Sequence, residues 1–251
     1  MLARPEKRLK TETAIMEQSS PKKSDHEGHR ARIKTRFKNS GLDGFLDHEV
    51  LELLLTYAIP RKDTKPIAWN LLKRYGSLSA AMDKDAGELS EVAGMGPEAA
   101  LFMTFLRALI RRYFLDNMKG KDVLKRPEDV IRYCRASLEG EKYEHFEVIY
   151  LTTKNTVINS EKISIGTIDR ASVSPRRIVE NALKSRAAGL IFVHNHPSGS
   201  PQPSKDDINL TNELGKAAHT LGLTVHDHII VGKNNYYSFR ANGLIKPQEE
   251  K

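Results

Sequence analysis

The feature that most limits how this chain can fold is residues 189–207, an apolar run that ends in two histidines and a proline-rich loop. Residues 190–193 are apolar and β-prone, so they predict a buried strand. His194 and His196 follow directly, and both imidazoles point to one side because side chains alternate along a strand. Proline and glycine then interrupt regular structure until Ser204, where a helical pattern begins. One loop therefore joins the end of a strand to the start of a helix.

Asp207 stands three residues after Ser204, in the first turn of that helix. With His194 and His196 it completes two imidazoles and one carboxylate, the ligand number of a catalytic zinc site that leaves a fourth position to water. Two simpler interpretations stay open: a His-x-His pair also arises by chance, and Ser204 with Asp207 is a helix-capping pattern, which is compatible with metal binding. We predict a site that holds one Zn²⁺ per chain, although iron or manganese could occupy the same ligands.

The spacing of these residues also resembles a known signature. His-x-His, seven residues, serine, two residues and aspartate is similar to the motif of the JAMM (MPN-type) metalloproteases. The version that runs from His194 through Gly199, with Ser204 and Asp207, resembles the bacterial RadC branch, and the resemblance extends from about residue 28 to 245. It implies an α+β chain, with an N-terminal all-α helix-hairpin-helix domain followed by an α/β MPN-like (JAMM, cytidine-deaminase-like) mixed sheet flanked by helices. It also implies a zinc-dependent hydrolase of the metallopeptidase or isopeptidase type, associated with DNA repair.

The resemblance further implies roles for residues around the metal. Ser204 matches the serine that stabilises the oxyanion, and a glutamate beside the first strand of the catalytic domain acts as the general base. Glu144 and Glu147 are the candidates. Glu144 fits better because it precedes the apolar strand pattern, whereas Glu147 lies inside that pattern as its solvent-facing residue. A surface charge at a strand entry is the alternative for Glu144.

A second His-x-His pair is His226-Asp227-His228, and no loop with an acidic residue follows it. The resemblance covers Asp227 and His228, so we interpret these two as residues that support the metal site. A ligating imidazole usually needs a carboxylate or carbonyl on its other nitrogen, and Asp227 could supply it.

Positive charge is concentrated at the N-terminus. Residues 1–40 hold eleven Lys and Arg and five Asp and Glu, so they contribute +6 to the net charge of +8. An arm of this kind, with Arg30 and Arg32 as candidate contacts, can bind DNA phosphates by releasing counterions. A solvated, disordered leader explains the same composition.

Gly94 and Gly96 separate a short helix from a long helix that begins at Pro97, which looks like a helix-hairpin-helix. In that module the glycines let backbone N–H groups approach a DNA phosphate. A tight corner between two helices, without any ligand, is the alternative. Glu98 stands where a Lys or Arg would help, which argues against tight phosphate binding.

Composition and pattern divide the 251 residues into segments. We predict a disordered basic leader at 1–25, a helical domain at 26–118, a linker at 119–126, the JAMM/MPN domain at 127–246 and a tail at 247–251. Within the helical domain we expect Trp69 in the core because its neighbours are apolar. The one cysteine, Cys134, cannot form an intramolecular disulfide, which fits the cytoplasm. No apolar run approaches the roughly 20 residues that span a bilayer, so we expect no membrane partner and leave a dimer open.

Two functions fit these observations. The first is a zinc-dependent hydrolase that cleaves a peptide or isopeptide amide in an unidentified protein or peptide substrate. The second is a DNA-binding accessory factor in repair or recombination, with or without metal-dependent nuclease activity. Nuclease activity is the poorer match, because a single site of two histidines and one aspartate differs from the two-metal clusters common in phosphodiester cleavage. The first two functions can coexist if DNA positions the protein.

Overall fold

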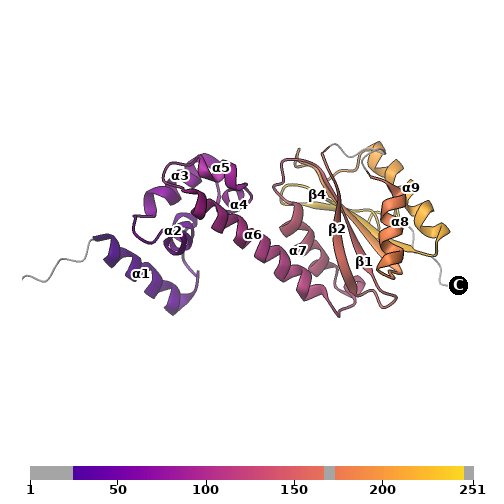
Figure 1. Ribbon diagram of the computed structural model, residues 1–251, viewed down its shortest axis with the longest axis horizontal. Helices are drawn as coiled ribbons and strands as arrows, with labels where there is room; N and C mark the ends of the chain where they lie inside the picture. Colours follow the sequence, from indigo (N-terminus) through magenta and orange to yellow (C-terminus); the bar gives the residue numbers. More distant parts are fainter. Residues whose placement is uncertain (1–24, 167–172, 246–251) are drawn as a thin grey trace, which may run out of the picture.

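The computed structural model describes residues 25–166 and 173–245, with side chains from Gly28 onward. Its N-terminal part is helical (Figure 1). The helices there are α1 (Asp25–Ser40), α2 (Asp47–Ala58), α3 (Lys65–Tyr75), α4 (Leu78–Met82), α5 (Ala86–Ser90) and α6 (Pro97–Met118). Capping residues and a proline determine where several of these helices begin. Ser77 and Asp85 cap α4 and α5 through their side chains, and α6 begins at Pro97.

The apolar faces of α2, α3 and the first half of α6 meet in one core, and we call α1 to α5 with this half of α6 the helical body. Trp69 lies outside this core, so the expectation that it is buried is wrong. It is 50% exposed, because Ile67 and Leu71 form the buried face of α3 and Trp69 points away from them. Its ring stacks on His48 instead, with 4.3 Å between centroids.

The C-terminal part is a mixed sheet with helices, as the sequence predicts. Its elements are η1 (Val123–Lys125), α7 (Pro127–Leu138), β1 (His145–Leu151), β2 (Val157–Ile165), α8 (Pro175–Lys184), β3 (Gly189–Asn195), α9 (Lys205–Thr220), β4 (Thr224–Val231) and β5 (Tyr236–Ser238). The strand order is β2-β1-β3-β4-β5. Only β3 and β4 pair in parallel among these neighbours, and the other pairs are antiparallel.

Helices cover both faces of this sheet (Figure 1). On one face α8 and α9 pack around Phe146 and Phe192, and on the other α7 and the end of α6 pack around Ile149 and Ile191. Because β3 is buried on both faces, its continuous apolar run needs no alternation with polar residues. His194, near the end of β3, lies on the same face as Phe192 and therefore under α9.

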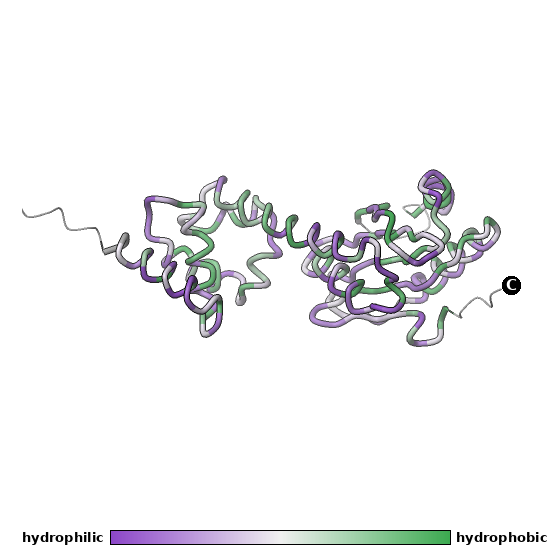
Figure 2. Tube along the Cα trace, turned by 90° about the horizontal axis from the view of Figure 1, so that it is seen from below, coloured by the Kyte–Doolittle hydropathy of each residue, from purple (hydrophilic) through white to green (hydrophobic). Residues whose placement is uncertain are grey.

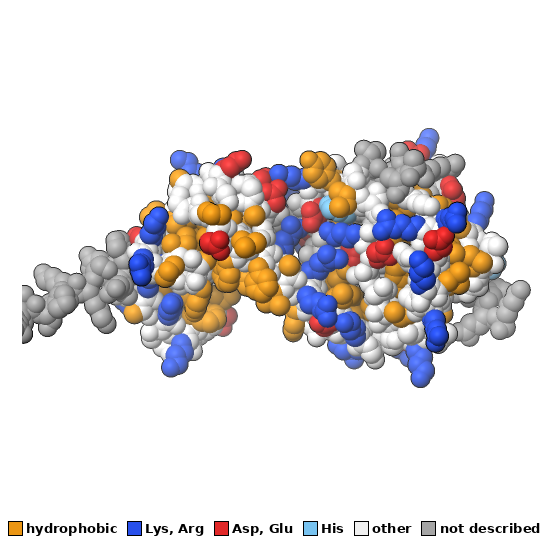
Figure 3. Space-filling view, in the orientation of Figure 1, with side chains coloured by type: hydrophobic (Ala, Val, Ile, Leu, Met, Phe, Trp, Pro, Cys, Tyr) orange, Lys and Arg blue, Asp and Glu red, His pale blue; other side chains and the backbone are white. Residues whose placement is uncertain are grey.

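One continuous helix, α6, connects the helical body to the sheet (Figures 1 and 2). Met103 is buried in the core of the helical body, and Met118 is buried beside α7 and the sheet. Val123 of η1 is buried in the second of these cores. Charged side chains of both signs cover the sheet face seen in Figure 3, whereas hydrophobic side chains gather over the helical body. Among the described helices, none has the length and apolar composition needed to cross a membrane.

Candidate metal centre

The loop after β3 brings the three predicted ligands together. Nε2 of His194 lies 3.0 Å from Nε2 of His196 and 3.1 Å from Oδ1 of Asp207, and Nε2 of His196 lies 3.4 Å from Oδ2 of Asp207. Ligand atoms about 2.0–2.1 Å from a tetrahedral zinc ion are roughly 3.3 Å apart. The closest approaches of these three side chains fit that spacing, so they could hold a metal ion.

A chain of hydrogen bonds behind His194 fixes which of its ring nitrogens carries the proton. Thr211 donates its hydroxyl hydrogen to the carbonyl of Asp207 at 2.6 Å, so its oxygen accepts from Nδ1 of His228 at 2.6 Å. With its proton on Nδ1, His228 accepts through Nε2 the N–H of His194 Nδ1 at 2.7 Å. The lone pair on Nε2 of His194 is then directed toward His196 and Asp207, which is the tautomer that a metal ligand needs. We call Thr211 and His228 the relay.

The loop after β3 orients the His196 ring so that, as in His194, Nε2 carries the lone pair that faces the cluster. Its Nδ1 donates to the carbonyl of Ser200 at 2.8 Å, which leaves Nε2 as the acceptor that faces Asp207. Its backbone N–H donates to the carbonyl of Val231 at 3.0 Å, and Gly199 returns a bond to its carbonyl at 2.9 Å. Gly199 has a φ of 87°, a conformation that favours glycine in this turn.

Burial and hydrogen bonding also shift the protonation equilibria of the three candidate ligands. Burial lowers the pKa of His194 and holds that of His228 well below its ordinary value, so both are neutral. The protonated ring of His196 can donate a hydrogen bond from Nε2 to Asp207, and this bond raises the pKa of His196 against the effect of burial. Burial acts to raise the pKa of Asp207, but the hydrogen bonds that the two imidazoles donate to it when they carry a proton on Nε2 hold it far below its ordinary range. His194 is 1% exposed and His196 is only half-buried, so the His196 side is the open side of the site.

Ser204 caps α9 and also touches a candidate ligand. Its hydroxyl donates to Oδ2 of Asp207 at 2.7 Å and accepts the N–H of Asp207 at 3.1 Å. The N–H of Ser204 donates to the same carboxylate oxygen at 2.7 Å, which completes a capping box. The capping interpretation and the ligand interpretation of this pair therefore coexist, because the cap holds Oδ2 while Oδ1 faces His194.

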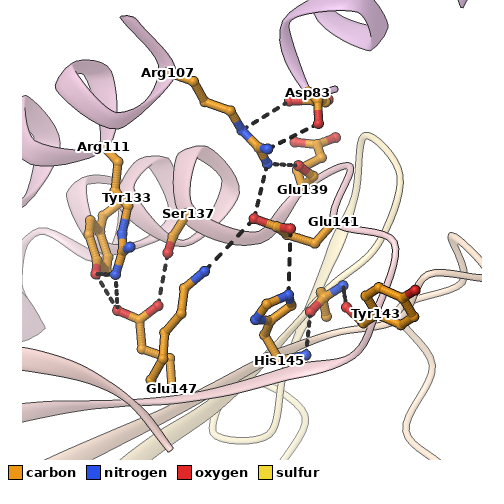
Figure 4. Close-up of polar contacts among 12 residues, drawn as sticks. Asp83, Arg107, Arg111, Tyr133, Ser137, Glu139, Glu141, Tyr143, His145 and Glu147 are labelled. Atoms are coloured by element: carbon orange, nitrogen blue, oxygen red, sulfur yellow. Dashed lines mark hydrogen bonds and ion pairs between the residues drawn. The ribbon is translucent and has the colours of Figure 1, made fainter. Parts of the chain in front are cut away.

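The structure separates the two candidate glutamates. Glu147 is fully buried under α7, where its carboxylate accepts hydrogen bonds from Tyr133, from Ser137 at 2.8 Å and from Arg111 at 3.4 Å (Figure 4). The interpretation of Glu147 as a solvent-facing residue is therefore wrong, because α7 and α6 cover that face of β1. Burial and the charge of Glu147 raise the pKa of Tyr133, so its phenol remains a donor to this carboxylate.

Glu144 directly precedes β1, at the end of the sheet where the ligands lie. Phe146, two residues later, pairs with His194 in the register of β1 and β3. The carbonyl of Glu144 accepts the N–H of Gly166 at 2.8 Å. Its negative charge acts to raise the pKa of His194, which burial lowers, and it adds to the rise that the Asp207 hydrogen bond causes at His196. Glu144 is therefore the candidate whose charge acts on both histidine ligands.

We expected Asp227 to contact the second ring nitrogen of a ligating histidine, but His228 makes this contact with His194. Asp227 accepts hydrogen bonds from Ser238 Oγ at 2.6 Å, from Arg240 N at 2.9 Å and from the N–H of His228. These bonds fix the turn after β5. The second nitrogen of the ligating His194 contacts the His228 ring instead.

The candidate DNA contacts on α1 differ in their surroundings. Arg30 donates to three carbonyls at the end of α2 and in the following loop, those of Ile59, Pro60 and Lys62. Arg32 is exposed on the outer side of α1. Arg30 therefore stabilises a helix end, and Arg32 is the better placed of the two to meet a ligand.

The two candidate glycines lie at the corner between α5 and α6. Gly94 has a φ of 91°, and a Cβ there would lie 2.8 Å from Cγ1 of Ile67 in the core of the helical body. Packing of this corner therefore accounts for a glycine at position 94. Gly96 is the residue before α6, and a Cβ there would meet no atom within 4 Å.

Thr211 and Asn195 are site residues that the sequence reasoning missed. Thr211 lies four residues after Asp207, so both are on one face of α9, but a threonine in a helix gives no further signal. Asn195 gave a stronger signal, since it is a polar residue between the two histidines in a strand that is otherwise buried and apolar. It is 3% exposed, and buried amides require partners.

Comparison with known proteins agrees with this geometry. Residues 124–244, which include α7 through β5, match the family model described as RadC-like JAB domain. The UPF0758 protein FN0909 of Fusobacterium nucleatum subsp. nucleatum is 42% identical over 228 residues, which cover 88% of this chain and 98% of that protein. The candidate ligands, the relay and Glu144 all lie within the matched domain. The chain therefore belongs to the family of RadC-like JAB-domain proteins.

Proposed function

We propose that this protein is a zinc-dependent hydrolase that cleaves a peptide or isopeptide amide bond. The observation that carries the proposal is the convergence of two imidazole Nε2 atoms and the Asp207 carboxylate, at closest approaches of 3.0–3.4 Å, on an open side of the sheet. The hydrogen bonds behind both rings support it, because they leave both Nε2 lone pairs for a metal. When bound, zinc supplies a Lewis acid and lowers the pKa of a coordinated water to about 7.

Residues of this chain would carry out the proton transfer and the stabilisation of the attacked carbonyl. Glu144 accepts the proton of the attacking water and passes it to the leaving amine. Ser204 lies beside Asp207 and is the candidate donor to the oxygen of the attacked carbonyl, for which its hydroxyl hydrogen must turn from Oδ2 of Asp207 to the substrate. Asp207 stays ionised at neutral pH because its pKa is held low, and His194 keeps its proton on Nδ1 through the relay.

Metal analysis of the purified protein tests this proposal. We expect about one zinc per chain in the wild type, and loss of that zinc in His196→Ala and in Asp207→Ala, because two ligands hold it weakly. Glu144→Gln is the matched control: it should retain zinc and lose most of its amide hydrolysis, with a residual rate that can still be measured. A folded wild type that binds no zinc even when zinc is added would overturn the proposal.

DNA binding by the helical body is a second candidate function. It is favoured by α1, where Lys34 and Lys38 are exposed four residues apart on one face and Arg32 is exposed on another. Contacts of this type release counterions, so the logarithm of the affinity falls by about 0.9 per phosphate contact for each logarithmic unit of salt. We expect Lys34→Ala with Lys38→Ala to make this slope shallower by about two contacts. An affinity that does not change with salt would exclude phosphate contacts by α1.

A further inference from the structure

Asn195 stands between the two histidine ligands, and its side chain reaches across to the segment that carries Glu144. Its Oδ1 accepts the N–H of His145 at 2.9 Å, and its Nδ2 donates to the carbonyl of Tyr143 at 3.1 Å. Figure 4 shows these two residues at the start of β1. They are the neighbours of Glu144 on either side, so one carboxamide bridges the backbone before and after the candidate base.

No other type of side chain reproduces this bridge. It needs a donor and an acceptor in one plane, which an amide supplies and a carboxylate or an aliphatic side chain does not. A third bond, from the N–H of Gly166 to the carbonyl of Glu144 at 2.8 Å, holds the same segment from β2. The backbone of Glu144 is therefore tied both to the ligand strand and to the edge strand.

We propose that Asn195 is a positioning residue that sets the distance between Glu144 and the metal ligands. The proposal rests on the proposed hydrolase function, in which Glu144 moves a proton. Because the bridge starts from the residue between His194 and His196, any movement of the ligands carries Glu144 with it. A misplacement of about 1 Å can cost roughly 100-fold in rate, so this bridge matters for turnover even though Asn195 touches no reacting atom.

A double-mutant cycle with Glu144 distinguishes positioning from a general structural role. We expect Asn195→Ala to retain zinc, to lower kcat by about 10- to 100-fold with little change in KM, and to speed hydrogen exchange at the amide of His145. In a Glu144→Gln background the same substitution should cause no further loss, because it acts through Glu144. Losses that multiply in the double variant, or an unchanged exchange rate at His145, would overturn the proposal.

Two further variants keep the test decisive. Asn195→Asp retains the acceptor for His145 and loses the donor to Tyr143, so its kcat should lie between those of the wild type and Asn195→Ala. If the Asn195→Ala protein does not fold, Asn195→Asp takes its place in the test. Asn181→Ala is the control, since Asn181 donates to Glu161 at 2.6 Å, far from the site, and should leave kcat unchanged. If Glu144→Gln keeps full hydrolysis, the proposed function itself fails. If Glu144→Gln loses most of its hydrolysis and Asn195→Ala is fully active, only the positioning role fails.

A separate observation concerns the outer side of α6. Leu101, Phe105, Leu109 and Tyr113 are 58%, 58%, 50% and 62% exposed. They are spaced four residues apart, so they form one inclined row along α6, whose first two members lie on the side opposite Met103. We call these four residues the α6 ridge. Figure 3 shows hydrophobic side chains gathered over the helical body and toward the middle of the molecule, where α6 runs.

The size of the α6 ridge points to a macromolecular contact. With aromatic side chains of about 150–250 Å² each, the ridge exposes roughly 400–500 Å² of apolar surface. That falls within the roughly 300–600 Å² of the largest patch on a typical monomer, which is often functional, and it is about half of the roughly 800 Å² that each partner buries in a standard interface. The surfaces beside the ridge would have to supply the rest.

We infer that a second copy of this chain covers the α6 ridge. A two-fold axis near residue 107 would place the aromatic Phe105 against the aliphatic Leu109 of the second copy, and the reverse, which is the self-complementarity that an isologous contact requires. Ridges with a spacing of four residues in both helices pack at a crossing angle of about 50°. The ridge is thus suited to pairing with itself.

The molecular mass in solution tests this inference. We expect light scattering to give twice the chain mass for the wild type and the single chain mass for Phe105→Glu, because the substitution buries an unpaired charge at the centre of the contact. Leu183→Glu is the matched control, since Leu183 is 56% exposed on α8 and lies outside the ridge, and it should remain dimeric. A wild type that is monomeric up to near-millimolar concentration, or a dimeric Phe105→Glu, would overturn the inference.

Discussion

At the scale of single residues, the positions of a few protons decide whether the ligand cluster can take a metal. His194 presents a lone pair only because His228 accepts its Nδ1 proton, and His228 can do so only because Thr211 accepts the proton on its other nitrogen. Burial keeps His228 neutral, which keeps this order of donors and acceptors in place. We therefore expect the Thr211 hydroxyl, which is not itself a candidate ligand, to influence the metal affinity of the proposed site.

Substitution of Thr211 tests the relay. Thr211→Val keeps the shape of the side chain and removes the acceptor for His228, so we expect the zinc affinity to fall about 10- to 100-fold, as for other groups behind metal ligands. Competition with a chromophoric chelator measures this affinity. Thr220→Val is the control, because Thr220 donates to the carbonyl of Lys216 at 2.9 Å in the same helix. Equal losses in the two variants would contradict a role for the relay.

The pH dependence of zinc binding should follow His196. Its pKa is raised because the protonated ring donates a hydrogen bond to Asp207, whereas the pKa of His194 is lowered by burial, so His196 is the first candidate ligand to take up a proton as the pH falls. That proton competes with the metal. The logarithm of the zinc affinity should therefore be constant above the pKa of His196 and fall by about one per pH unit below it. Calorimetric titration at several pH values measures this, and a constant affinity in mild acid would contradict it.

At the scale of elements, β1 separates two glutamates that lie three residues apart. Glu144 meets the ligand end of the sheet, while Glu147 is enclosed by Tyr133 and Ser137 of α7 and Arg111 of α6. A buried carboxylate with three donors holds α7 and α6 against β1. The strand therefore combines a candidate catalytic position with a structural one.

Glu147→Gln should separate these two roles. The substitution removes the charge that faces Arg111 and disturbs the donors around it, so we expect the free energy of unfolding to fall by about 1–3 kcal/mol with zinc content unchanged. Urea denaturation measures the change. Glu180→Gln is the control, because Glu180 forms an exposed pair with Arg176 and such pairs contribute little. Loss of zinc without loss of stability would contradict the structural role of Glu147 and would indicate that Glu147, not Glu144, acts at the metal site.

The elements around the site could be predicted from sequence because their signals are local. The apolar run of β3, the prolines after His196 and the cap at Ser204 lie within a short stretch, and the mixed sheet follows from the same kind of pattern. Trp69 and Asp227 were misplaced because their neighbours along the chain do not determine which face of α3 or β4 meets another element. Thr211 was missed for the same reason, since only the tertiary contact between α9 and β4 brings it to His228.

At the scale of the whole molecule, the helical body contacts the segment that leads to Glu144. Arg107 of α6 donates to the carbonyls of Asp83 at 3.0 Å and Glu139 at 3.1 Å, and it lies 3.4 Å from the carboxylate of Glu141 (Figure 4). Gly140 has a φ of 80°, and a Cβ there would contact the side chain of Asp83. The helical body and the C-terminal part therefore meet beside the start of β1.

Gly140→Ala should loosen this contact. The new methyl group would meet Asp83, so we expect the helical body to move away and the radius of gyration from X-ray scattering to increase. Gly120→Ala is a matched control: its φ of 71° imposes similar backbone strain, but no atom lies within 4 Å of the added carbon. Identical scattering from the two variants would show that the junction does not depend on Gly140.

The relay also has a consequence for how the protein is made. Translation delivers Glu144 first, then His194 and His196, then Asp207 and Thr211 on α9, and His228 on β4 last. A nascent chain thus carries every ligand before it carries the residue that settles the tautomer of His194. Under the proposed function, tight metal binding would therefore wait until β4 has been synthesised and has paired with β3.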